Sequence, residues 1–150
     1  DYSVTACVYQ PPLVLGGMID FYVTPKGAPL SVVTDSLSNT TMFAEHVGGA
    51  SVYSRGGAKV AENDVAFGHI GALNRLLHRT SSSDGKIAYA GNCVINCANA
   101  SNAPFSFHPG GANIAFGDGS VRFLKESIAV DTLFRLVGVN DGGIISSDAY

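Results

Sequence analysis

The stretch that decides the fold is residues 106–123, which read SFHPGGANIAFGDGSVRF. Asp118-Gly119 predicts a two-residue hairpin loop, because a type I′ turn needs positive φ at both central positions. That loop would set the pairs Gly117–Ser120, Phe116–Val121, Ala115–Arg122 and Ile114–Phe123. One face of the hairpin would then be entirely apolar, formed by Ile114, Phe116, Val121 and Phe123. The sequence therefore predicts a half-buried antiparallel hairpin.

Around this hairpin the chain has the composition of an ordinary folded domain. Its 150 residues predict a single globular domain over residues 1–150. The net charge is −3 and the 9 Lys and Arg residues are scattered, which argues against nucleic acid as a partner. No run of 18 apolar residues is present, so no segment of this chain is expected to cross a membrane.

The remaining periodicity predicts an α+β fold with a mostly antiparallel sheet and few short helices. Strands are expected over residues 4–8 and 41–47, with a short last strand at 144–145. An apolar stripe predicts a helix over residues 127–137. Residues 58–79 are ambiguous, because Ile70, Leu73, Leu76 and Leu77 have helical spacing.

Several short blocks of the chain resemble one bacterial family. His108, nine residues and then Asp118-Gly119 are similar to the H-x9-DG signature of prepilin-like proteins. Further blocks resemble the family in the same order: Asp1-Tyr2 at the start, TDSLSNTTMFAE at residues 34–45, INC at 95–97 and VNDGGIIS at 139–146. Ser36 stands where the family usually has Gly, and Ile144 where it usually has Glu.

The resemblance implies an exported, non-enzymatic, pilin-like structural protein at the cell surface or outside the cell. Such proteins are pseudopilin relatives of largely unassigned function, and some are catalogued as solute-binding. The implied fold is a pseudopilin-like globular head, and the implied partners are further copies or other pilin-like subunits. Family members begin with a basic leader and a long apolar helix. No segment here resembles that helix, so membrane contact is expected only through a helix outside this chain.

Export bears on the cysteines at positions 7, 93 and 97. Cys93 and Cys97 are candidates for a disulfide in an oxidising compartment. They could instead be two metal ligands, although two further ligands are not evident, or two unrelated buried thiols. Cys7 has no obvious partner.

The candidate site residues come from the same blocks. His108 is either a loop anchor held by hydrogen bonds or a ligand contact, and Asp35, Asn39 and Glu45 are candidate ligand or ion contacts. Glu45 is expected to pair with Arg55 or with the loop at residues 38–40. Asp118 and Gly119 belong to the motif but are explained by the turn, and an extended hairpin would keep Asp118 far from His108.

No motif of a known catalytic class is present, so the chain is not expected to be an enzyme. A hydrolase site around His108, Glu45 and Asp118 is the third hypothesis, after assembly and binding. No cofactor or metal is expected; calcium on Asp141 and Asp148 is the weak exception, because regularly spaced oxygen ligands are missing. Six tyrosines leave open the alternative of a secreted module that binds carbohydrate, including polysaccharide, or another solute.

Overall fold

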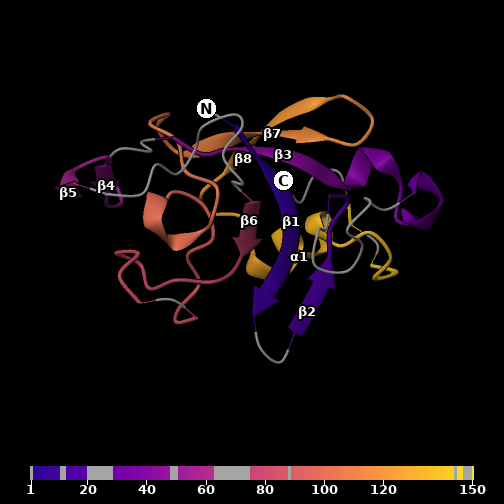
Figure 1. Ribbon diagram of the computed structural model, residues 1–150, viewed down its shortest axis with the longest axis horizontal. Coiled ribbons are helices and arrows are strands. Elements are labelled where there is room, and N and C mark those ends of the chain that lie inside the picture. The colour runs from indigo at the N-terminus through magenta and orange to yellow at the C-terminus, as the bar shows by residue number, and fades with distance from the viewer. Residues whose placement is uncertain are drawn as a thin grey trace.

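A computed structural model of the protein places the 106–123 stretch at one side of a six-stranded sheet (Figure 1). The structure describes residues 2–10, 13–19, 29–47, 51–62, 75–87, 89–143, 145–146 and 150. The strands are β1 Tyr2–Gln10, β2 Leu13–Gly16, β3 Thr41–Glu45, β4 Ser51–Tyr53, β5 Lys59–Glu62, β6 Arg75–His78, β7 Gly111–Phe116 and β8 Val121–Lys125. The helices are α1 Val130–Val137 and the 3₁₀ turns η1 Leu30–Val32, η2 Leu37–Asn39 and η3 Asn99–Ser101.

The sheet is mostly antiparallel, which confirms the predicted α+β class. Its order is β2-β1-β3-β7-β8, and β6 pairs with β1 in parallel. Strands β4 and β5 form a separate antiparallel pair. In Figure 1 this pair lies at one side of the molecule, and η2 and the tip of the β7–β8 hairpin lie at the other.

The register of the hairpin differs from the predicted register by one residue. Ala115 lies opposite Val121, and the turn contains three residues. The Gly119 amide donates to the Phe116 carbonyl at 3.0 Å, and the Phe116 amide donates to the Ser120 carbonyl at 2.9 Å. Gly119 has φ 85°, whereas Asp118 is not among the residues with positive φ. The loop is therefore a type I turn closed by a glycine bulge, and the type I′ prediction is wrong.

This one-residue difference exchanges the two faces of β8. Val121 and Phe123, predicted to be buried, are 61% and 45% exposed. Arg122 and Leu124 lie on the core side instead, opposite Ile114 and Ala112. Strand β7 keeps its predicted inner face, because Ile114 and Phe116 are both buried.

Aromatic rings accommodate Arg122 on the apolar side of the sheet. Its guanidinium carbon lies 4.5 Å from the centre of the Phe116 ring and 5.3 Å from that of Tyr150. Its Nη1 donates to the Tyr150 hydroxyl at 2.6 Å, and that hydroxyl donates to Asn39 Oδ1 at 3.0 Å. The cation therefore keeps favourable ring contacts and a hydrogen bond beside the core.

Two other sequence interpretations can be compared with the structure. The ambiguous range 58–79 contains strand β6 at residues 75–78, so Leu76 and Leu77 lie in a strand despite their helical spacing; Ile70 and Leu73 lie outside the described residues. Of the expected last strand at 144–145, Ile145 is not in a strand and packs against the core, and Ile144 lies outside the described residues.

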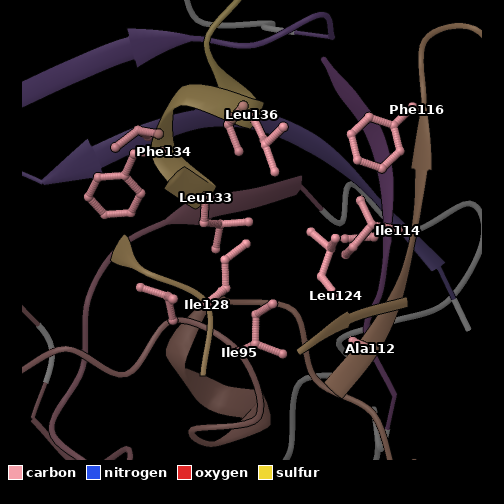
Figure 2. Packing of buried hydrophobic residues seen from close by; sticks show 13 residues of the cluster. Ile95, Ala112, Ile114, Phe116, Leu124, Ile128, Leu133, Phe134 and Leu136 are labelled. Carbon is pink, nitrogen blue, oxygen red and sulfur yellow. The ribbon is translucent and has the colours of Figure 1, made fainter. Parts of the chain in front are cut away.

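The core lies between the inner face of the sheet and α1. The helix begins at Val130, inside the predicted range, and buries Leu133, Phe134, Leu136 and Val137. Figure 2 shows side chains of α1 and of the hairpin on opposite sides of this core, with Ile95 and Ile128 beside them. Among the described residues, no helix has both the length and the apolar character needed to cross a membrane.

Candidate binding site

The motif histidine is in contact with the glutamate at the end of β3. His108 Nε2 lies 3.2 Å from Glu45 Oε1, and the two side chains are 56% and 10% exposed. Glu45 Oε2 accepts hydrogen bonds from the Asn113 amide (3.0 Å) and from Asn113 Nδ2 (3.1 Å). Two donors of Asn113 therefore hold one nearly buried carboxylate, and they fix it beside an open histidine. The expected pairing of Glu45 with Arg55 or with residues 38–40 is wrong.

A second hydrogen-bond network shapes the loop that carries His108. Asn96 Nδ2 donates to the Gly111 carbonyl (3.0 Å), and Asn96 Oδ1 accepts the Ser106 amide (2.8 Å). The Ser106 hydroxyl donates to the same Gly111 carbonyl (2.8 Å) and accepts the His108 amide (2.9 Å). Asn96 has φ 56°, a conformation that asparagine tolerates better than most residues. These contacts give the INC block a structural role as the base of the His108 loop.

Cys93 and Cys97 are joined in a disulfide, with their Cα atoms 5.8 Å apart. The bond closes a small loop that includes Asn96, and all of residues 93–97 are buried. It therefore supports the residue that holds the His108 loop. Among the described residues, no cluster of three His, Cys, Asp or Glu side chains could hold a metal ion.

A cavity of about 380 Å³ opens beside this network. Its lining includes Phe107, His108, Gly110 and Glu126, together with Gly56-Gly57. We call this cavity the motif pocket. It is within the size range of small-molecule sites, and it brings together an aromatic ring, a histidine and a carboxylate.

Phe107 is the most unusual side chain of the motif pocket. It is 54% exposed, although large apolar side chains are usually buried. The edge-to-face partners of its ring are Tyr53, at 4.9 Å between centroids, and Phe105, at 5.9 Å. Sequence analysis missed Phe107 as a site residue and included Tyr53 only as one of the six tyrosines that could bind carbohydrate. The available signal was the position of Phe107 directly before His108-Pro109-Gly110, where the chain turns.

An ion pair between Arg55 and Glu126 lies at the rim of the motif pocket. Arg55 Nη2 lies 3.1 Å from Glu126 Oε1, and both side chains are partly exposed. The Glu126 amide donates to the Gly110 carbonyl (2.8 Å), which ties the end of β8 to the His108 loop. Neither Arg55 nor Glu126 could have been assigned here from sequence, because the contact joins residues 71 positions apart.

Two buried histidines lie outside the motif pocket. His46 Nε2 hydrogen-bonds the Asn99 carbonyl oxygen at 2.8 Å, and burial lowers the pKa of His46. Burial, with a smaller contribution from the charge of His46, lowers the pKa of His78 to about 3. Within the described part of the chain, neither ring nitrogen of His78 has a hydrogen-bond partner. Both rings are therefore neutral near pH 7.

The other predicted site residues lie at the opposite end of the hairpin. Asp118 caps its own turn, since Oδ1 accepts the Ser120 amide at 2.8 Å. Hydrogen bonding to the side chain and then to the amide of Ser120 lowers the pKa of Asp118. Asp35 accepts the amides of Asp141 (2.7 Å) and Gly142 (3.2 Å), so its carboxylate joins two of the resembled blocks. Asn39 accepts the Tyr150 hydroxyl.

The predicted ligand set is therefore divided between two places. His108 and Glu45 lie near the start of strand β7, whereas Asp118 and Asn39 lie near its end, so these four residues do not form one site. Asp141 Oδ1 accepts the Gly143 amide at 2.6 Å, and Asp148 lies outside the described residues.

One family model matches the chain. It is named SBP_bac_10, is described as "Protein of unknown function (DUF1559)", and covers residues 21–131. No curated protein and no solved structure matches the chain.

Proposed function

The chain belongs to the DUF1559 family of proteins of unknown function, and we propose that it is an exported, non-enzymatic, pilin-like assembly protein. The observation that carries this proposal is the outward face of the hairpin, where Val121 and Phe123 are exposed on β8. In the described part of the sheet, β8 has β7 as its hydrogen-bonding neighbour. An apolar strand at a sheet edge is a template for pairing with another chain. The H-x9-DG spacing supports the same function.

Self-association of the full-length protein tests the proposal. Replacing Val121 and Phe123 together with Glu places charge on the outward face without touching the core. The variant should stay monomeric in sedimentation at concentrations where the wild type assembles. Leu30→Glu is the matched control, because Leu30 is 64% exposed and lies in η1, outside the sheet. A wild-type protein that is monomeric at every concentration and forms no filaments in electron micrographs would contradict the proposal.

The second candidate function is binding of a carbohydrate or another solute outside the cell. The motif pocket favours it, because an exposed aromatic ring lies beside polar groups in a cavity of about 380 Å³. The family model also has a name of the solute-binding type. A glycan array and a panel of soluble oligosaccharides test this function, and no binding to any of them would reject it.

A further inference from the structure

We propose that the motif pocket binds a neutral saccharide, with one sugar ring stacked on Phe107 and its hydroxyl groups hydrogen-bonded to Glu126 and His108. The inference rests on the second candidate function and gives it a ligand class and a set of contacts. Assembly through β8 does not depend on it.

The orientation of Phe107 is the first argument. Its ring packs edge-to-face with Tyr53 and Phe105, at interplanar angles of 84° in both pairs. These contacts hold the ring in place while more than half of the residue stays exposed. A fixed, solvent-exposed ring in a cavity is a platform for the flat C–H face of a pyranose, which buries apolar area without requiring charge.

The charges around the motif pocket are the second argument. Glu126 is paired with Arg55 and Glu45 with His108, so each carboxylate already has a positive or proton-donating partner. An anionic ligand would be repelled by the two carboxylates, and a cationic ligand would compete with the partner that each carboxylate already has. A neutral ligand keeps both pairs. Its hydroxyl groups can use the remaining lone pairs of Glu126, since a carboxylate accepts up to about four hydrogen bonds.

The rigidity of the pocket base is the third argument. Asn96 and Ser106 are buried and fully engaged in holding the His108 loop, and the disulfide closes the loop that carries Asn96. The polar groups left for a ligand are therefore those at the rim, Glu126 and His108, which face solvent in part. Pre-formed geometry lowers the entropy that binding must overcome.

Isothermal titration calorimetry with cellotetraose, xylotetraose, maltotetraose and chitotetraose tests this inference. Co-sedimentation with insoluble cellulose and xylan distinguishes binding of a polymer from binding of a free sugar. For whichever probe binds the wild type, Phe107→Ala should weaken the affinity at least tenfold, and Phe107→Tyr should restore it. Phe123→Ala is the matched control, because Phe123 is similarly exposed but lies on the outward face of β8, and it should change the affinity less than twofold. Circular dichroism of each variant checks that it folds.

Three outcomes would overturn the inference. A saccharide that binds equally well to the wild type and to Phe107→Ala would leave the second function standing but place its site elsewhere. Binding of spermidine in place of the sugars, lost in Glu126→Gln, would assign the motif pocket to a cationic ligand. No binding of any saccharide would reject both the inference and carbohydrate binding as the second function, and would leave the assembly proposal unaffected.

Discussion

One half of the H-x9-DG motif lies at each end of strand β7, and the polar groups of the two halves differ in their environment. We call residues 36–41 and 116–120 the Asp118 end, and residues 45–46, 93–99 and 105–113 the His108 end. At the Asp118 end, the Asp118 carboxylate accepts the Ser120 amide, and the Asp118 and Gly117 amides donate to the carbonyls of Leu37 and Thr40. At the His108 end, His108 and Phe107 remain more than half exposed beside a cavity.

The difference shows that the Asp118 half of the motif is structural, whereas the His108 half keeps side chains exposed to solvent. At the Asp118 end, polar groups take part in the turn and in backbone hydrogen bonds of the fold. The His108 end uses buried groups, Asn96 and Glu45, to hold exposed ones in place. Substitutions should therefore reduce stability most at the buried supports of the His108 end and least at the exposed turn.

The largest effect is expected for Asn96→Ala. The variant loses two buried hydrogen bonds and places alanine at φ 56°, so the free energy of unfolding should fall by about 3 kcal/mol in urea titrations. Asn102→Ala is the matched control, because Asn102 has φ 55° but is only partly buried, and it should lose about 1 kcal/mol. Equal losses in the two variants would mean that backbone conformation alone explains Asn96.

The second effect is acid sensitivity at His78, a buried residue of β6 that is coupled electrostatically to His46 of the His108 end. The unfolded chain protonates His78 below pH 6.5, whereas the folded chain does so only near pH 3, because burial lowers the pKa of His78 to about 3. This contribution to stability is present above pH 6.5 and is lost as the pH falls from 6.5 towards 3. Unfolding at pH 5 should therefore require about 2 kcal/mol less than at pH 8.

Urea titrations of wild type, His78→Leu and Asp118→Ala at both pH values measure this effect. His78→Leu should remove most of the difference between pH 5 and pH 8. Asp118→Ala should leave the difference in place, because the pKa of Asp118 is lowered from a starting value of 3.8 and the group titrates below this window. A wild type equally stable at both pH values would show that the His78 ring is protonated without penalty.

Sequence reasoning located the hairpin but exchanged the inner and outer faces of β8. The alternation of Ile114 and Phe116 correctly predicts the inner face of β7, since both are buried. The same alternation cannot determine β8, because a two-residue and a three-residue turn fit Gly117-Asp118-Gly119 equally well. The outcome depends on Arg122, which is stable on the inner face only because Phe116 and the distant Tyr150 flank it.

The candidate site, like the hairpin, could be predicted only in part from the sequence. His108 and Glu45 were both identified, but their pairing requires that β3 and β7 be neighbours in the sheet, which local pattern does not reveal. Phe107 looks like any core aromatic in the sequence, and its exposure follows from the hydrogen bonds that Ser106 and Asn96 make around it. Contacts between remote segments decide what the motif presents to solvent.

The third prediction concerns strain at the Asp118 end. Ser36 has φ 75° and ψ 134°, a region that glycine adopts readily and other residues adopt with strain. Ser36→Gly should therefore stabilise the chain by about 1 kcal/mol in thermal or urea unfolding. Ser38→Gly is the matched control, because Ser38 is not among the residues with positive φ, and it should lose about 0.5 to 1 kcal/mol. A destabilised Ser36→Gly variant would mean that the contact of the Ser36 and Ser38 hydroxyls, at 2.9 Å, outweighs the strain.

The smallest effect is expected for Asp118→Ala, because the Asp118 side chain is exposed and solvent replaces its contact with the Ser120 amide. The melting temperature should fall slightly at pH 7. Since its hydrogen bonds lower the pKa of Asp118, the carboxylate contributes stability above pH 3.8 and loses that contribution as the pH falls through its folded value. The difference between variant and wild type should therefore disappear in strong acid, whereas Gly119→Ala, which strains φ 85°, should remain destabilised at every pH. If Asp118→Ala lowered the melting temperature as much as Asn96→Ala, the Asp118 end would be as essential to the fold as the His108 end, and the contrast between them would fail.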